Sequence, residues 1–318
     1  MTTRLATTPK SPRRERLVRL VDRALDGALR LPKGTPPLLE EAMRYCVLPG
    51  GKRFRPLLVL GGCEAVGGSM ARAMPVACSV ELIHAYSLVH DDLPAMDNAA
   101  QRRGRPSCHR QFGEATAILV GDALLTRAFE LLSIHDTPNA LLILQTIGRA
   151  SGTVGLIGGQ ALDLATTERG ASPPRPEQSA GRGGEPAPAG AKGGAAPISE
   201  IRRSGPGGQG AGVRVPDLEE VARRKTAALM TASVVTGGLA GGASETALSR
   251  LRRFGERLGV AFQGTDDLHD GDGLVALCGA DAVQRRTQQL IHEAKQELRT
   301  FGRHATLLDD LADWLATA

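Results

Sequence analysis

The sequence predicts an all-α fold, and three observations support this. Apolar residues recur with the three- and four-residue spacing of helices along most of the 318 residues. No region sustains the two-residue alternation of a β-strand. Several stretches are apolar on nearly every side, as expected for helices buried inside a large bundle. The 42% hydrophobic content is enough for one large core.

Proline and glycine mark the limits of the N-terminal helices. The first predicted helix ends before residues 32–37, which contain three prolines, and the second ends at Pro49 and the two glycines after it. Pro56 is compatible with the third helix because it falls in the first turn. The predicted helices cover residues 16–29, 38–47, 55–66, 74–93, 115–134 and 139–157, and a further helix begins at residue 159.

A segment of different composition separates these helices from the C-terminal ones, which are predicted at residues 218–240, 247–270, 274–301 and 307–315. Residues 170–215 are rich in Gly, Pro, Ala and Arg and hold no aromatic residue. Such a segment buries too little apolar surface to offset the entropy of ordering, so we expect a disordered insertion. It interrupts a single domain over residues 17–318, and the polar, basic residues 1–16 are expected to form a mobile tail.

Charge and cysteine content narrow the functional class. The formal net charge of +5 suits nucleic acid or a small polyanionic substrate. Basic residues close to acidic clusters favour the substrate, without nucleic-acid binding. No apolar run reaches transmembrane length, so no membrane span is expected. The five cysteines are odd in number and lack metal-binding spacing, which predicts reduced thiols in a cytoplasmic protein.

Two acidic clusters follow apolar, helix-patterned stretches, where unpaired carboxylates are costly. In the first, residues 91–97 (DDLPAMD), a proline disturbs the helix and lets Asp97 return beside Asp91. In the second, residues 266–270 (DDLHD), Asp266 and Asp270 share one helix face. Mg²⁺ binds through a few carboxylates together with phosphate oxygens. The clusters therefore predict a magnesium and phosphate site between two helices.

Basic and polar side chains near these clusters suit phosphate groups. Lys52 and Arg55 precede a helix, and Arg102 and Arg103 follow the first cluster. Taken alone, each pair is equally consistent with a solvated turn or loop. Arginine offers a bidentate fork to phosphate and lysine a mobile point charge, which favours the binding interpretation beside the aspartates.

Two further positions lie inside apolar helices. His84 is seven residues before Asp91 and shares its helix face, although a lone histidine there is more often a core residue. Lys225 and Thr226 together offer a cation and a hydroxyl, and the alternative is a lysine whose stem covers apolar surface.

The motifs together resemble those of a known family. Their order is GKRFRP, ELIHAYSLVHDDLPAMD, RRGRPS, GDALL, GGQALDL, RKTAALM and AFQGTDDLHD. This set resembles the trans-isoprenyl diphosphate synthases, and is most like the bacterial farnesyl diphosphate synthases, over about residues 17–315 apart from the insertion. The resemblance implies an isoprenoid-synthase-type helical bundle around a central apolar cavity, and we expect a homodimer.

The resemblance also implies the roles of individual residues. The ligands of three Mg²⁺ ions around an allylic diphosphate are Asp91, Asp92, Asp97, Asp266 and Asp270. Arg102, Lys225, Thr226 and Gln263 match positions that contact that diphosphate or its metal ions. Lys52, Arg55, His84 and Arg103 match the site for isopentenyl diphosphate. The residues expected to carry the chemistry are Asp91, Asp92, Asp97, Arg102, Lys225 and Asp266. The implied reaction is ionisation of dimethylallyl or geranyl diphosphate, attack by isopentenyl diphosphate, and loss of a proton.

Product length is predicted from the residues before the first cluster. Tyr86, five residues before Asp91, is expected to point into the cavity and stop the chain at C15, giving farnesyl diphosphate. Ser87 is too small to block growth. Geranylgeranyl diphosphate is the alternative product.

The sequence departs from the family after Asp270. A flexible loop with a Gly-Lys step is replaced by residues 271–273, which lead directly into a helix, so one phosphate-binding lysine is absent. Residues 99–101 also lack the further acids that are common in the family. These departures leave open a weakened enzyme or a non-catalytic subunit. A terpene cyclase would share the fold, but it has no need of the residues that match the isopentenyl diphosphate site.

Overall fold

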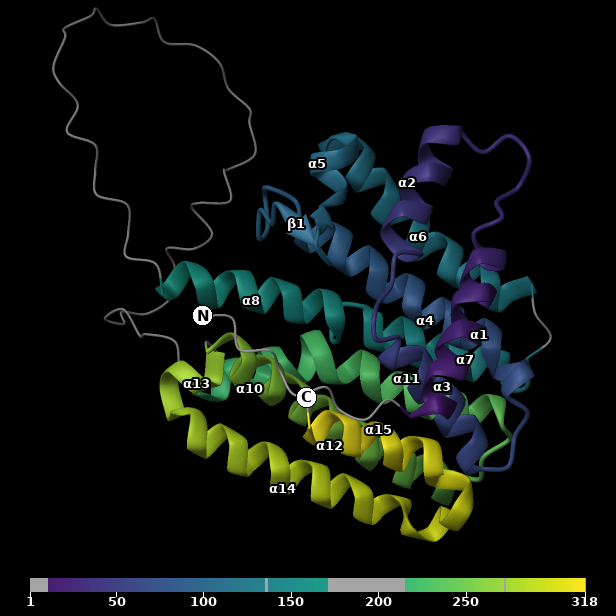
Figure 1. Cartoon of the computed structure of the whole chain (residues 1–318), viewed down its shortest axis with the longest axis vertical. Coiled ribbons are helices and arrows are strands. Elements are labelled where there is room, and N and C mark those ends of the chain that lie inside the picture. Colours follow the sequence, from purple (N-terminus) through teal and green to yellow (C-terminus); the bar gives the residue numbers. More distant parts are fainter. Residues whose placement is uncertain (1–10, 135–136, 171–214, 272, 318) are drawn as a thin grey trace, which may run out of the picture.

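The computed structural model describes residues 11–134, 137–170, 215–271 and 273–317. Predictions for residues 1–10 and for most of the insertion, residues 171–214, lie outside the described residues. The described chain is a helical bundle, as predicted (Figure 1). Its N-terminal helices are α1 (Pro12–Ala28), α2 (Pro37–Val47), α3 (Phe54–Ala65), α4 (Met70–Asp91), α5 (Cys108–Phe112), α6 (Glu114–Ile134), α7 (Ala140–Ser151) and α8 (Leu156–Gly170).

The C-terminal half begins with one long helix that changes its winding. Here α10 (Val215–Val221) continues into a π-helical segment, η1 (Ala222–Ala227), and then into α11 (Ala228–Ala240). The remaining elements are α12 (Glu245–Asp270), α13 (Gly273–Cys278), α14 (Ala280–Leu298), the 3₁₀ segment η2 (Arg299–Ala305) and α15 (Thr306–Ala316). In Figure 1, α14 runs along one edge of the bundle beside α12, and α6 lies on the opposite side.

The structure corrects several predicted boundaries. The expected tail ends earlier, because Ser11 caps the N-terminus of α1 and Pro12 occupies its first turn. The stretch expected as one helix over 139–157 is two helices, since Gly152 takes an extended conformation after α7. Likewise 274–301 is broken at Gly279, whose φ is +79°. Glycine permits the positive φ at Gly279 because it lacks a Cβ atom.

A short hairpin was not predicted. Its strands β1 (Gln101–Arg102) and β2 (Arg105–Pro106) pair antiparallel, with Arg102 opposite Arg105. Arg103 and Gly104 form the turn with φ of +53° and +73°. Two-residue hairpin turns need positive φ at both central residues. Strands this short give no alternating pattern in the sequence.

The centre of the bundle is the contact between α3 and α11. A Cβ atom on Gly62 would lie 2.2 Å from the carbonyl oxygen of Val234, and one on Gly237 would lie 2.0 Å from that of Val59. The two backbones therefore touch directly, and glycine is required on both sides. Both helices are almost completely buried.

One stretch, Ala140–Ala165, is long and apolar enough to cross a membrane by length and composition alone, and 28% of its apolar 18-residue window is buried. It contains the break at Gly152 between α7 and α8. The expected absence of a membrane span therefore stays a prediction.

Candidate active site

A cavity of about 800 Å³ brings the two acidic clusters together. It lies between α3, α4, α8, η1 and α12 and also receives side chains from the hairpin. The predicted site residues that line it are Arg55, His84, Ser87, Asp91, Asp97, Arg102, Arg103, Lys225, Thr226, Gln263, Asp266 and Asp270. Lys52 is exposed at its edge, and the lining does not include Asp92 or Tyr86.

Asp91 ends α4 and is buried, 5% exposed. Gln160 of α8 donates to Asp91 Oδ1 at 2.9 Å, and Lys225 Nζ lies 3.9 Å from Asp91 Oδ2. Burial raises the pKa of Asp91, and Lys225 and Gln160 oppose that shift. The chain turns after α4, and the backbone N–H of Asp97 donates to the carbonyl of Asp91 at 2.8 Å. The predicted return of Asp97 toward Asp91 is therefore observed.

Asp92 binds the hairpin instead of facing the cavity. Arg102 Nε donates to both carboxylate oxygens of Asp92, at 3.1 and 3.2 Å. Asp92 is only 2% exposed, whereas the side chain of Arg102 is 41% exposed, so the carboxylate is shielded from water but its partner is not. A carboxylate occupied by a guanidinium fork is a poor metal ligand in this arrangement. In this arrangement Asp92 positions Arg102, and its predicted role as a metal ligand stays a prediction.

The hairpin is fastened to α2 by Tyr45, which the sequence analysis did not single out. The Tyr45 hydroxyl donates to the carbonyl of Pro106 at 2.8 Å, and the guanidinium of Arg105 lies 4.0 Å from the centre of the Tyr45 ring. Phe112 packs edge-on against the same ring. Arg103 donates to the carbonyl of Gly50 at 2.6 Å. These contacts fix the hairpin that presents Arg102 and Arg103.

The three carboxylates of the second cluster have different surroundings. Asp267 is buried and accepts from Gln263 at 2.8 Å and from the backbone N–H of Leu274 at 2.9 Å, which secures the short turn into α13. Asp270 is exposed at the end of α12. Asp266 faces the cavity and forms no hydrogen bond or ion pair with a described residue. Burial raises its pKa to about 6, although Lys52 and Arg55 oppose this.

One wall of the cavity, here called the basic wall, carries Arg55 from α3 and His84 from α4. Arg55 is half-buried, its buried Nε has no partner among the described residues, and burial lowers its pKa. The pKa of His84 lies well below its ordinary value, first because of burial and then because Arg55 and Arg103 lie nearby. His84 is therefore a neutral hydrogen-bonding group between cations. An unpaired buried guanidinium is costly unless an anion binds it.

Arg53 and Glu81 support this wall and were also missed. Arg53 has φ of +47° and is 2% exposed. It donates to Glu81 at 2.8 Å, to Asp22 at 2.8 Å and to the carbonyl of Val47 at 2.8 Å. This buried network fixes the turn that carries Lys52 and Arg55. Arg53 lies in the GKRFRP motif, but the spacing of its basic residues does not show which of them bind a ligand and which support the fold.

Helix α8 adds two residues without a predicted role. Asp163 accepts from Lys225 at 2.6 Å, and Gln160 binds Asp91 as described above. A Cβ atom on Gly159 would lie 2.3 Å from the backbone nitrogen of Lys225, so glycine is needed for α8 to approach η1. The GGQALDL motif could have indicated these two roles, because its glycine, glutamine and aspartate all contribute to the contact between α8 and η1 or Asp91.

The donor set fits magnesium that is bound together with diphosphate. Among the described residues, no three carboxylate, imidazole or thiol groups converge closely enough to hold a metal ion by themselves. Asp91, Asp97, Asp266 and Asp270 nevertheless line one cavity, beside Lys225 and Arg102. Mg²⁺ typically uses one or two carboxylates plus phosphate oxygens and water. Separate carboxylates around a cationic cavity match that requirement.

Comparison with known proteins agrees with this geometry. The family model described as polyprenyl synthetase matches residues 36–177 and 209–313. The chain belongs to the polyprenyl synthetase family. The predicted resemblance to trans-isoprenyl diphosphate synthases and the all-α fold class are therefore confirmed.

Relatives of this polyprenyl synthetase carry two kinds of name. It is 39% identical over 307 residues to the heterodimeric geranylgeranyl pyrophosphate synthase large subunit 1 of Arabidopsis thaliana, covering 89% of this chain and 72% of that protein. It is 34% identical to a geranylgeranyl diphosphate synthase of Cyanophora paradoxa, covering 90% and 89%. Among solved structures, an FPP/GFPP synthase from Zymomonas mobilis matches with a TM-score of 0.77 and 32% identity, covering 96% of this chain and 97% of that one. The chain is a prenyltransferase that extends prenyl chains by condensation.

Tyr86 does not line the cavity that holds the two acidic clusters, and its role in product length stays a prediction. Residues five apart on a helix are separated by about 140° around the axis, at about 100° per residue. The face of α4 toward the cavity instead holds His84, Ser87 and Asp91. The Tyr86 ring is 3% exposed and packs edge-on against His90, which contacts the carbonyl of Ile118 in α6 at 3.0 Å.

Proposed function

We propose that this chain condenses isopentenyl diphosphate with dimethylallyl or geranyl diphosphate in a Mg²⁺-dependent reaction and releases farnesyl diphosphate. The observation that supports this best is one cavity between α4 and α12, which combines six carboxylates, four of them at predicted metal positions, with Arg55, Arg102, Arg103 and Lys225. Two polyanionic substrates need two cationic regions. The hairpin and η1 supply one, and the start of α3 supplies the other.

In this proposal the allylic diphosphate is the leaving group. Asp91, Asp97, Asp266 and Asp270 would hold three Mg²⁺ ions, which supply positive charge to the departing diphosphate. Arg102 and Lys225 donate hydrogen bonds to the same oxygens, and the Thr226–Gln263 pair (2.8 Å) supplies neutral polar groups beside them. Charge stabilisation at the leaving group lowers the barrier to breaking the carbon–oxygen bond.

Isopentenyl diphosphate is proposed to bind at the second cationic region. Among the described residues Arg55 has an unpaired Nε–H, Arg103 is held by the carbonyl of Gly50, and the N–H of neutral His84 can donate a hydrogen bond without adding charge. Lys52 lies at the exposed edge. Binding there places the double bond of isopentenyl diphosphate toward the allylic carbon. The new carbon–carbon bond then forms, and loss of a proton restores a double bond.

Product length is the finer part of the proposal. Tyr86 packs against His90, which contacts α6, and its buried hydroxyl has no partner among the described residues. A prenyl chain growing along α4 toward α6 would meet this ring after limited extension, which supports C15. The names of the similar plant and algal proteins favour C20 instead.

The deciding experiment is product analysis. The pure protein is incubated with Mg²⁺, isopentenyl diphosphate and dimethylallyl diphosphate, and chain length is read by chromatography. We expect C15 from the native chain and C20 or longer from Tyr86→Ala, with Tyr45→Phe as a tyrosine control. A native C20 product would select the geranylgeranyl alternative. No turnover by a folded protein would select the non-catalytic subunit, which the short turn from Gly271 into α13 favours.

We also propose a homodimer that forms through α6 and α7. Large apolar side chains are exposed there, including Leu119 at 59% and Leu141 at 68%. Sedimentation of the native chain and of Leu119→Ser/Leu141→Ser tests this, and a monomeric native chain would contradict it. A cytoplasmic location is proposed from the thiols, since all five cysteines are free.

A further inference from the structure

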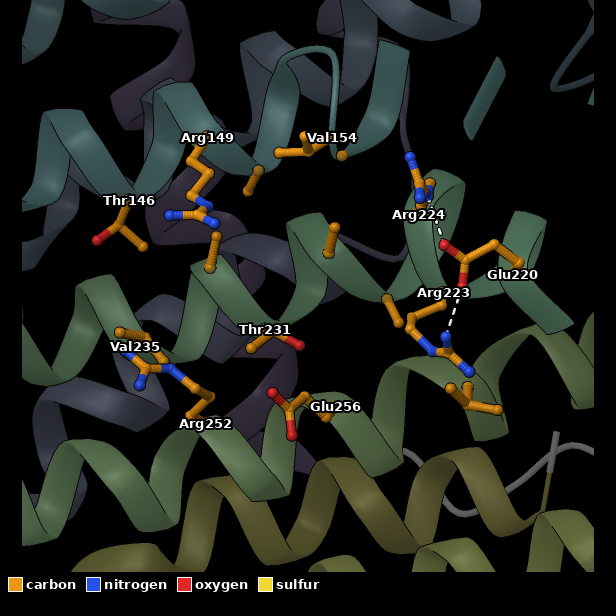
Figure 2. A pocket seen from close by; sticks show the side chains of 16 residues that line it. Thr146, Arg149, Val154, Glu220, Arg223, Arg224, Thr231, Val235, Arg252 and Glu256 are labelled. Carbon is orange, nitrogen blue, oxygen red and sulfur yellow. Dashed lines mark hydrogen bonds and ion pairs between the residues drawn. The ribbon is translucent and has the colours of Figure 1, made fainter. Parts of the chain in front are cut away.

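A second cleft of about 900 Å³ opens on the outer surface of the bundle, and Figure 2 shows it from close by. Its walls are α7 on one side and α12 on the other, and η1 and α11 form its floor. No residue lines both this cleft and the active-site cavity. The floor is apolar where Ala228, Ala232 and Val235 face outward, and Val260 adds to it from α12.

The charged side chains of the cleft are mainly cationic. Four arginines line it, Arg149, Arg223, Arg224 and Arg252, against two glutamates, Glu220 and Glu256. Arg223 and Arg224 both bind Glu220, at 2.5 and 2.6 Å. The side chains of Arg149 and Arg252 form no hydrogen bond or ion pair with any described residue. In Figure 2 they extend from opposite walls toward the part of α11 that carries Val235.

The floor also contains an unsatisfied hydroxyl. Thr231 Oγ1 is buried and has no hydrogen-bond partner among the described residues. Unpaired buried hydroxyls are uncommon, because each loses its bond to water without gaining another. A cleft with two unpaired guanidinium groups, an unpaired hydroxyl and an apolar floor suits a ligand with an anionic head and an apolar tail.

The cleft and the active site share one element. Within η1, Arg223 and Arg224 line the outer cleft, while the next two residues, Lys225 and Thr226, line the active-site cavity. A π-helical segment departs from regular α-helical hydrogen bonding and is frequent at functional sites. Ala227, the last residue of η1, also lines the outer cleft, so a ligand tail that lies over the floor contacts the segment that presents Lys225.

We propose that this outer cleft binds an amphiphilic phosphate or diphosphate, and that its occupancy reaches the active site through η1. The headgroup pairs with Arg149 and Arg252, and the tail lies over α11 toward Val260. The effect on the active site rests on the proposed function, whereas ligand binding in the outer cleft does not.

Binding is tested without metal, so that it is separate from turnover. Farnesyl monophosphate is titrated calorimetrically into the full chain in EDTA, with inorganic phosphate and farnesol as head-only and tail-only probes. We expect Arg149→Ala/Arg252→Ala to weaken farnesyl monophosphate binding at least ten-fold. The control Arg299→Ala/Arg303→Ala removes two exposed arginines from η2 and is expected to stay within two-fold. Each single probe should bind more weakly than the amphiphile.

Several results would overturn the site. They are the absence of metal-independent binding, equal affinity in the Arg149→Ala/Arg252→Ala variant, and a change of oligomeric state in that variant without a change in anion affinity. The last would make this face a subunit contact. Coupling is read by hydrogen exchange at residues 222–227, which should change when the ligand binds to the native chain but not to the double variant. Unchanged exchange in the liganded native chain would refute the coupling.

Discussion

The two acidic clusters have similar sequences but different surroundings. In the first, Asp91 contacts Gln160 and Lys225, and Asp92 is held by Arg102. In the second, Asp266 has no direct partner among the described residues, and its pKa is raised to about 6. The first cluster is therefore arranged by the protein's own cations before any ligand binds. The second retains an electrostatic cost that bound cations would relieve.

The largest expected effect is on catalysis. Asp91→Ala and Asp266→Ala should each lower kcat by roughly 1,000-fold or more, because each removes a carboxylate that would hold Mg²⁺ at the leaving group. Steady-state assays with circular dichroism measure activity and fold together. Asp281→Ala, at an exposed position in α14, is the charge-matched control. Near-native turnover in either cluster variant would remove that cluster from the metal site.

The next largest expected effect is on substrate binding, through the position of the hairpin. Tyr45→Leu should raise KM for isopentenyl diphosphate about ten-fold while changing the melting temperature little, because small displacements of binding groups are costly. Tyr45→Phe keeps the ring contacts with Arg105 and Phe112 and should recover part of this loss. Equal kinetics in all three proteins would mean that other contacts hold the hairpin.

The free energy of unfolding distinguishes the two acidic clusters most directly. Without metal, Asp266→Asn should raise the free energy of unfolding by about 1–2 kcal/mol, since a neutral side chain avoids the cost reflected in the raised pKa of Asp266. Asp91→Asn should give no comparable gain, because it weakens the contact with Lys225. Urea denaturation in EDTA measures both. Stabilisation by Asp91→Asn alone would reverse the comparison.

The smallest effect concerns His84 and pH. Its folded-state pKa lies well below the ordinary value, whereas the unfolded chain binds a proton near pH 6.5. Stability is therefore lost as pH falls below about 6.5, because protonation favours the unfolded chain. The free energy of unfolding of His84→Gln, measured relative to that of the native chain, should therefore rise as the pH is lowered from 7.5 to 5.5. A constant difference over this range would show that His84 titrates normally.

Helix type and the pairing of the acidic clusters could be predicted because they depend on repeated patterns. The turn at Asp97 followed from Pro94. Distance along the helix could not show that Tyr86 is absent from the lining of this cavity, because rotation about the axis decides which face a side chain joins. The ion pair between Asp92 and Arg102 was not predicted, because Arg102 lies on a hairpin too short to produce a pattern. Gln160 and Asp163 gain their roles only through the contact between α8 and η1.

The direct backbone contact between α3 and α11 has a consequence for how this protein tolerates mutation. Gly62 and Gly237 lie in the core and touch no proposed ligand, yet even alanine at either position would collide with a carbonyl oxygen. In a library of random variants selected for activity, these two positions should be as depleted of substitutions as the aspartates of the cavity. Intolerance there would report the spacing of two helices, so a map of intolerant positions alone would overstate the extent of the active site.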